Sequence, residues 1–288
     1  MALALRNFWW LLRRAFVLGY QNGCFGVAKA AAYSALLAFF PLLTTTASIL
    51  VDARAQDISR VLSRALFEVV PPGTESLVMY QLTVRGARPT MLLVVASLIS
   101  VWAATGLITS LIEGFRAAYH VPFGRPWVRE RALAVLLVFA AAVPAVGASV
   151  LIVLGERVER NVLSWLGVIP AGADLQGWIE LAGLLSRYGV ALGTVMFVAA
   201  VLYYMGPNRP QQWSRVWPGA ILATGLWFLA TLGFAWYVRN IANYNLLYGS
   251  IGAVIALLVW MYVLSAVALI GCEFNAEMER TFTSGREV

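Results

Sequence analysis

Two acidic residues, Glu113 and Glu273, stand near the ends of long apolar runs, where an ionisable side chain is costly unless it is paired. Arg116 follows Glu113 by one helical turn, and Asn275 follows Glu273 closely. An acid at this depth can serve as a gate or a proton site, or as an ion-paired clamp between helix ends. We favour the clamp, with Glu273 paired to an arginine of a neighbouring helix end and Asn275 helping to end the helix.

Other polar residues lie within the apolar runs or between them. Pro41 removes one helix hydrogen bond, and Thr45 with its neighbouring threonines can rebond the freed carbonyls or face a partner helix. Tyr244, Asn245 and Tyr248 fall in a short connection, where they can bind a headgroup, close the mouth of a bundle or anchor the chain at the interface. These features suit a transport path, but ordinary packing also accounts for them.

The sequence shows no pattern typical of a catalytic or metal site. His120 is the only histidine, which excludes HExxH zinc sites and any triad that requires a second imidazole. The 14 acids are scattered along the chain, whereas two-metal hydrolysis needs carboxylates that converge on ions roughly 4 Å apart. A Walker A phosphate loop is missing, and Cys24 and Cys272 form neither a disulfide framework nor a CxxC site. We therefore predict no catalytic residue, no metal and no cofactor.

The elements that position these residues are membrane helices. Of the 288 residues, 61% are hydrophobic and 12% charged, against roughly a quarter charged in soluble proteins. Six windows reach the roughly 20 residues that cross a bilayer. Backbone groups in lipid must bond within their own segment, so we predict an all-α polytopic protein with a single membrane domain over 1–288. The six spans lie near residues 27–50, 91–113, 132–154, 184–204, 216–238 and 248–273.

Segments outside the spans are predicted to be amphipathic. Residues 1–20 lack the apolar core of a cleaved signal and have apolar and arginine-bearing faces, which predicts a retained interfacial helix. In the outer loop 51–90, an apolar stripe from Ile58 to Val69 predicts helices over 57–84 that cap the bundle or lie on lipid. Within the spans, the pairs Gly189 with Gly193 and Gly252 with Ala256 predict close helix contacts.

The distribution of arginine predicts the orientation. The short connections favour both termini in the cytoplasm. Glu113 and Glu273 then lie at the cytoplasmic boundary, at a depth similar to that of Arg116, Arg131 and Arg215. The net charge of +7 has its simplest cause in these arginine-rich loops, so we expect no nucleic-acid partner.

Several motifs together resemble one family of membrane proteins. They are "AAAYSALLAFFPLL" from Ala30, "GRPWVRERALAV" from Gly124, "PGA" from Pro218, "YGSIGA" from Tyr248 and "GCEFNAE" from Gly271. This set is similar to the YihY/virulence factor BrkB family of bacterial inner-membrane proteins. The resemblance implies six spans, a name linked to serum resistance and, in some members, a suspected movement of lipids or envelope material. Some members once carried a tRNA-processing ribonuclease label, which the scattered acids here do not support.

Physical reading of the motifs gives further expectations. Pro218 is predicted in the first turn of the fifth span, with Gly219 and Ala220 allowing close helix contact. For function, we favour a transporter or flippase-like exporter of an anionic amphiphilic lipid, with membrane lipids as partners. A non-transporting scaffold for envelope assembly is the alternative, and a membrane-bound ribonuclease is the least favoured. Substrate, direction, energy source and oligomeric state are left open.

Overall fold

The computed structural model describes residues 2–52, 90–165, 177–240 and 250–284. Within these ranges the chain forms α-helices and no strand, which confirms the all-α class. Four predicted features lie outside the described residues: the helices over 57–84, Tyr244, Asn245 and Tyr248.

All six predicted spans correspond to long helices. Each contains a segment apolar enough to cross a membrane, so the chain is a polytopic helical membrane protein. A further helix precedes them at the N-terminus. The described helices are α1 (Ala2–Gln21), α2 (Cys24–Asp52), α5 (Thr90–Ala118), α6 (Trp127–Trp165), α7 (Gly177–Met205), α8 (Trp213–Asn240) and α10 (Ser250–Ser284).

Two predicted positions within the helices are wrong. Helix α10 continues to Ser284, so Asn275 lies inside the helix and does not end it. Beyond Glu273, the acids Glu277 and Glu279 of the continuing helix are paired with arginines. Helix α8 begins at Trp213, earlier than expected, so Pro218 lies beyond its first turn. There Pro218 cannot donate a hydrogen bond to the carbonyl one turn back.

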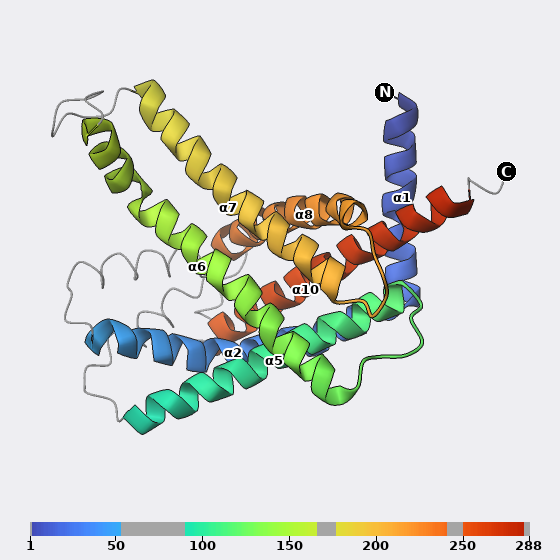
Figure 1. Cartoon of the computed structure of the whole chain (residues 1–288), viewed down its shortest axis with the longest axis horizontal. Helices are drawn as coiled ribbons and strands as arrows, with labels where there is room; N and C mark the ends of the chain where they lie inside the picture. Colours follow the sequence, from blue (N-terminus) through green and yellow to red (C-terminus); the bar gives the residue numbers. More distant parts are fainter. Residues whose placement is uncertain (1, 53–89, 166–176, 241–249, 285–288) are drawn as a thin grey trace.

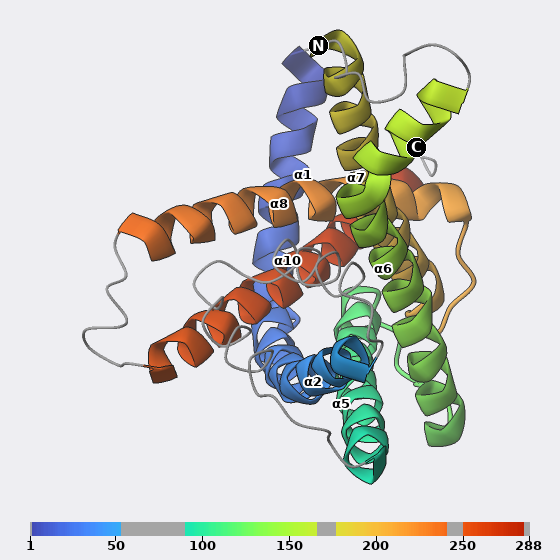
Figure 2. The same ribbon diagram turned by 90° about the vertical axis from the view of Figure 1, so that its left-hand side faces the viewer.

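Helix α10 lies at the centre of the arrangement. It packs against α1, α2, α5 and α8, while α2 pairs with α5 and α6 pairs with α7 (Figures 1 and 2). Helices α6 and α7 run side by side. They lie close to α5 where α5 and α7 end, and they are far from α2 and α5 at the opposite end of the bundle (Figure 1). The helices are therefore close together at one end of the bundle and spread at the other.

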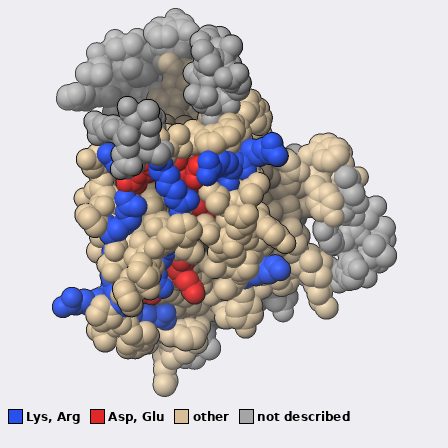
Figure 3. Space-filling model, turned by 90° about the vertical axis from the view of Figure 1, so that its right-hand side faces the viewer, with Lys and Arg blue, Asp and Glu red and all other residues tan. Residues whose placement is uncertain are grey.

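The closely packed end carries most of the described charge, and we call it the charged end. It comprises α1, the starts of α2, α6 and α8, and the ends of α5, α7 and α10. Lys and Arg side chains gather there with Asp and Glu among them (Figure 3). We call the remainder of the six spans, on the other side of their midpoints, the far half.

The larger of two clusters of buried hydrophobic residues lies on the side of the charged end. Small residues dominate it, which allows the helix backbones to approach closely. Phe115 and Tyr203 fill its centre, with their rings in edge contact at 5.3 Å. The core residues are Cys24, Ala28, Ala31, Leu111, Phe115, Ala118, Ala200, Tyr203, Val216, Ala220, Ala223, Ala266, Leu269, Cys272 and Ala276.

The two predicted small-residue pairs have different surroundings. Gly252 and Ala256 are buried, as expected for a close helix contact. Gly189 and Gly193 are exposed on α7, and a Cβ atom added at either would meet open space. The prediction is wrong for this second pair because no described neighbour approaches the face of α7 that carries the two glycines.

Helix α1 is amphipathic and packs on the end of α10. Ala15 and Gly19 are buried, and the rings of Phe8 and Phe274 are 5.8 Å apart. Arg14 lies over the ring of Trp10 at 4.8 Å. That α1 lies in the membrane interface stays a prediction, but the structure shows which face of α1 packs against α10.

Candidate functional site

The segment 271–277 of α10 is buried at every position, although a helix surface ordinarily has an exposed side. It contains Glu273, Asn275 and Glu277. Residues four apart share a face of a helix, so Glu273 and Glu277 point to one side and Asn275 to the other. Each of these polar side chains therefore meets a different neighbouring element.

Asn275 bonds to the backbone of α8. Its Oδ1 accepts a hydrogen bond from Gly219 N at 2.6 Å, and its Nδ2 donates to Val216 O at 2.9 Å. All of the polar atoms of the amide are thus directed at the same helical turn. A buried amide with both ends bonded fixes the register of α10 on α8.

Gly219 and Gly271 allow this contact between α8 and α10. A Cβ atom on Gly219 would overlap the carbonyl oxygen of Gly271 and the side chain of Asn275. One on Gly271 would overlap the Tyr203 hydroxyl and lie 2.8 Å from the carbonyl oxygen of Gly219. Tyr203 in turn donates to Ala268 O at 2.7 Å, which ties α7 to the same part of α10.

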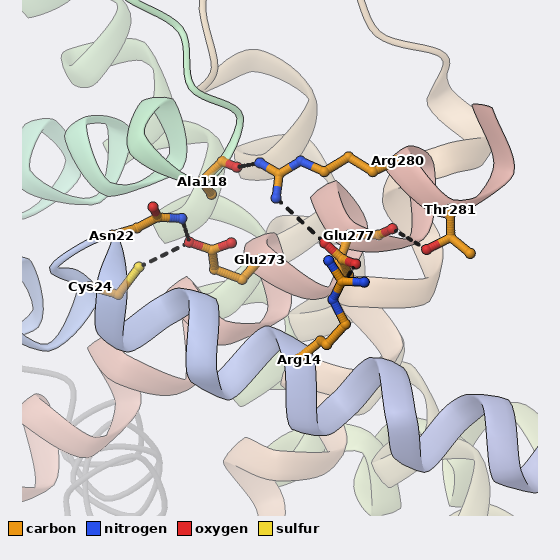
Figure 4. Close-up of polar contacts among 8 residues, drawn as sticks. All are labelled: Arg14, Asn22, Cys24, Ala118, Glu273, Glu277, Arg280 and Thr281. Atoms are coloured by element: carbon orange, nitrogen blue, oxygen red, sulfur yellow. Dashed lines mark hydrogen bonds and ion pairs between the residues drawn. The ribbon is translucent and has the colours of Figure 1, made fainter. Parts of the chain in front are cut away.

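Glu273 faces the turn between α1 and α2. Its Oε1 accepts from Asn22 Nδ2 at 2.7 Å and from Cys24 Sγ at 3.6 Å, and its Oε2 is buried without a hydrogen-bond partner (Figure 4). Gly23 forms the turn with φ of 73°, a conformation that glycine adopts without steric cost. The predicted arginine partner is not found among the described residues: neutral donors take its place.

Arginines instead bind the acids further along α10. Glu277 pairs with Arg14 of α1 at 2.8 Å and with Arg280 at 3.5 Å. Arg280 also donates to Ala118 O at 2.6 Å (Figure 4). These contacts connect α1, α10 and the end of α5, and they form the clamp that we had expected at Glu273.

The end of α5 has a recognisable termination. His120 has φ of 52°, Val121 N donates to Arg116 O at 2.9 Å, and His120 N donates to Ala117 O at 3.0 Å. This pair of bonds is the Schellman motif, and histidine is among the residues that tolerate its left-handed position. Arg280 thus adds a cation where the carbonyls of α5 are exposed, which is favourable for the helix dipole.

A second ion-paired group lies beside the first. Glu279 Oε1 accepts from Arg209 at 2.6 Å and from Arg215 at 3.1 Å. The guanidinium of Arg209 lies 4.5 Å from the ring centre of Tyr119. Burial raises the pKa of the Tyr119 hydroxyl well above its usual range. The loop after α7 and the start of α8 are thereby fixed to α10.

Arg125 caps α7. Its two terminal nitrogens donate to Gly206 O and Met205 O, each at 2.8 Å. Burial lowers the pKa of the Arg125 guanidinium, while the nearby Glu130 acts in the opposite sense. A guanidinium fork matches two adjacent carbonyls at a helix end, where its charge is also favourable.

Glu113 and Glu273, for which the sequence predicts a similar depth, have different surroundings. Glu113 is exposed, whereas Glu273 is buried. Arg116 pairs with Glu130 at 3.4 Å, and Arg131 donates to Trp102 O at 3.2 Å. No common site of Glu113 and Glu273 is therefore formed among the described residues.

Two further predicted residues lie on α2. Pro41 is inside the helix, which continues through it to Asp52. Thr45 belongs to the same helix, but its side chain is outside the described part of the chain. The expectation of a kinked, hydroxyl-bearing path at this position stays a prediction.

Several residues that the sequence analysis did not select prove central. They are Arg14, Asn22, Glu277 and Glu279. The spacing of Glu273 and Glu277, one turn apart with Asn275 between them, was an available signal for a helix with polar side chains on opposite sides. In the part of the chain that the structure describes, no three His, Cys, Asp or Glu residues are grouped so as to hold a metal ion.

The fold and this site define a class: a multi-pass helical membrane protein whose last helix is enclosed by its neighbours at one charged end. The chain belongs to the family described as "Virulence factor BrkB", whose model matches residues 20–287. This confirms the family resemblance found in the sequence motifs. No solved structure matches the chain.

Some relatives of this chain are named as membrane proteins, and one is named as ribonuclease-like. "Putative ribonuclease-like protein YfkH" of Bacillus subtilis (strain 168) is 28% identical over 261 residues, which is 88% of this chain and 90% of that protein. A "UPF0761 membrane protein" of Tolumonas auensis is 26% identical over 290 residues, 96% of this chain and 91% of that protein. Another, of Alkalilimnicola ehrlichii, is 28% identical over 261 residues, 88% of this chain but only 55% of that protein.

Proposed function

We propose that this protein moves an anionic amphiphilic lipid, or a related envelope component, across the bacterial inner membrane. In this proposal the charged end faces the cytoplasm, with both termini on that side, as the arginine distribution predicts. The partners are membrane lipids, whose headgroups meet the charged end first.

The proposal rests on buried polar atoms of the far half that have no hydrogen-bond partner in the described part of the chain. They are Ser100 Oγ on α5, Thr231 Oγ1 on α8 and Trp260 Nε1 on α10. A buried hydroxyl or N–H without a partner is costly, and more so in lipid, so each calls for an explanation. A polar headgroup that passes between these helices would supply the missing partner.

Other hydroxyls on the same helices provide a contrast. Thr105 donates to Trp102 O at 2.6 Å, Thr224 to Ala220 O at 2.8 Å, and Ser265 to Met261 O at 2.8 Å. These hydroxyls bond their own helix and need no outside partner. Ser100 and Thr231 therefore differ from residues of the same kind one or two turns away.

The apolar surfaces of the far half suit acyl chains. Val143 on α6 and Leu185 on α7 are 68% and 62% exposed, and both helices diverge from α2 and α5 there (Figure 1). An amphiphile needs an apolar surface for its chains together with polar positions for its headgroup. The far half offers both on neighbouring helices.

Exposed cations at the charged end favour an anionic headgroup. Arg13, Lys29 and Arg129 are exposed on α1, α2 and α6. A Lys or Arg at the membrane surface contributes about 1 kcal/mol to the attraction of anionic lipids. A zwitterionic or neutral substrate would gain nothing from this arrangement.

Thr231 and Thr224 offer a matched test on one helix. The purified protein is reconstituted into vesicles with fluorescent phosphatidylglycerol, and movement between leaflets is followed by quenching from outside. We expect Thr231→Val to slow the transfer several-fold and Thr224→Val to leave it unchanged. Wild-type vesicles that quench no faster than empty ones would contradict lipid transport and favour the scaffold role.

The ribonuclease-like name of the Bacillus relative suggests a different activity. A nuclease would need acids free to bind metal ions or to act on water. At the charged end, Glu277 and Glu279 are each held by two arginines, and Glu273 is held by Asn22 and Cys24. These contacts favour transport over hydrolysis as the function of this chain.

A further inference from the structure

Glu273 is the most enclosed acid at the charged end. Its exposed fraction is 0%, and only one carboxyl oxygen has donors, Asn22 Nδ2 and Cys24 Sγ. The other oxygen, Oε2, is buried and has no hydrogen-bond partner (Figure 4). A carboxyl in this position has one oxygen that is held and one that is available to a ligand.

The ion pairs nearby do not include Glu273. Arg14 and Arg280 pair with Glu277, and Arg209 and Arg215 pair with Glu279. Among the described residues, no Lys or Arg forms an ion pair with Glu273. Both of its hydrogen-bond donors are neutral groups, an amide and a thiol.

This environment distinguishes Glu273 from a structural ion pair. A carboxylate buried without a countercharge is costly, whereas the neutral acid is not. Binding a proton at Oε2 removes that cost without moving any cation. Release of the proton becomes favourable only when the carboxylate gains water or a cation, which requires α10 to move relative to the turn at Gly23.

We propose that Glu273 is the proton-binding site that drives the transport proposed above. Oε2 takes a proton from hydronium when the contact with the turn between α1 and α2 is open to water, holds it while the carboxyl is enclosed, and returns it to water when the contact opens again. The bond formed and broken is the Oε2–H bond: hydronium becomes water when the proton is taken up, and water becomes hydronium when it is released. This inference rests on the proposed function, to which it adds the energy source.

Charged and titratable groups of every neighbouring element act on this site. The groups are Arg14 from α1, Cys24 from α2, Tyr119 and His120 after α5, and Cys272, Glu277 and Arg280 from α10.

Asn275 supplies the link to the rest of the bundle. It lies half a turn from Glu273 on α10 and is bonded to Gly219 and Val216 of α8. A shift of α10 that opens the Glu273 contact must therefore carry α8 with it or break these bonds. In this way a proton bound at the charged end is coupled to Thr231 in the far half of α8.

Infrared titration of the full-length protein in lipid nanodiscs tests the binding site without any transport assay. A protonated carboxyl has a carbonyl band that an ionised one lacks. We expect such a band to be present in the wild type, absent in Glu273→Gln and unchanged in Glu113→Gln, whose side chain is exposed. The band is expected to disappear as the pH is raised across the range in which the protein stays folded, because the carboxyl then releases its proton.

Two results would overturn the binding site: identical spectra for wild type and Glu273→Gln, or a band that does not change across this range. The variant Asn22→Leu removes one donor to Oε1 and gives a second measurement if Glu273→Gln does not fold. It is expected to move the pH at which the band disappears. An unmoved band would contradict the assignment to Glu273.

Transport in vesicles with an imposed pH gradient tests the coupling separately. We expect the gradient to accelerate transfer of labelled phosphatidylglycerol by the wild type and by Glu113→Gln, and to have no effect on Glu273→Gln. Transfer that ignores the gradient in the wild type would overturn the coupling while leaving lipid transport intact. A titrating band in a protein that moves no lipid would instead contradict the proposed function and retain the proton site.

Discussion

The charged end and the far half are built from the same six helices but differ in how their polar side chains are bonded. At the charged end the α10 segment 271–277 is enclosed, and its polar side chains bond to neighbouring helices. In the far half, α6 and α7 are largely exposed, and Ser100 and Thr231 keep buried hydroxyls without partners. The difference indicates one end that holds the helices together and another that is able to change its contacts.

Several bonds at the charged end join a side chain to the backbone of another helix. Asn275 binds the backbone of α8, Arg280 that of α5, and Arg125 that of α7. A backbone group keeps its position when side chains around it change rotamer. Such bonds therefore fix helix positions more firmly than contacts between two flexible side chains.

The largest effect is expected where the backbones of α8 and α10 meet. The variant Gly219→Ala places a Cβ atom on the Gly271 carbonyl, which cannot move without shifting α10. We expect destabilisation of about 3 kcal/mol or more, seen as a lower melting temperature and loss of the monodisperse peak in detergent. In the control Gly225→Ala on the same helix, the added atom meets open space. Equal behaviour of the two variants would mean that this contact does not close the bundle.

Removing the Asn275 amide is expected to have the next largest effect. Asn275→Ala loses two buried hydrogen bonds to α8, each of which is worth about 1 kcal/mol or more. We expect a loss of about 2–4 kcal/mol in thermal unfolding. Asn208→Ala is the control, because its bond to Phe123 O is exposed and 3.4 Å long. A melting temperature unchanged by Asn275→Ala would contradict its role in fixing α10 on α8.

A smaller effect is expected at the clamp between α1 and α10. Glu277→Gln weakens the pairs with Arg14 and Arg280, whose guanidinium groups remain partly in water. We expect about 1–2 kcal/mol of destabilisation and faster hydrogen exchange in α1. Glu113→Gln, at an exposed position, is expected to change the stability by less than about 0.5 kcal/mol. Unchanged exchange in α1 would show that other contacts hold this helix.

The six spans could be predicted from the sequence because a bilayer demands long uninterrupted apolar helices. The partner of Asn275 could not be predicted, because backbone N–H and carbonyl groups occur at every residue and carry no sequence signature. We predicted an arginine partner for Glu273 from its depth in the membrane. The arginines instead pair with Glu277 and Glu279, which lie nearer the end of the helix. Their guanidinium groups stay closer to water there. The prediction of a close helix contact at Gly189 and Gly193 of α7 was wrong, because the spacing of small residues does not indicate whether another helix lies opposite them.

Distances between spin labels test the contrast between the two halves most directly. Helices α6 and α8 offer a pair at the charged end, Val128 with Ser214, and a pair in the far half, Val143 with Leu232, all at exposed positions suited to labelling through introduced cysteines. The native Cys24 and Cys272 are buried. We predict that anionic lipid, added at a fixed pH so that the protonation of Glu273 does not change, shifts the distance distribution of the far pair and leaves that of the charged-end pair unchanged. A far pair that does not respond, or two pairs that shift together, would contradict a fixed charged end that supports a far half able to open.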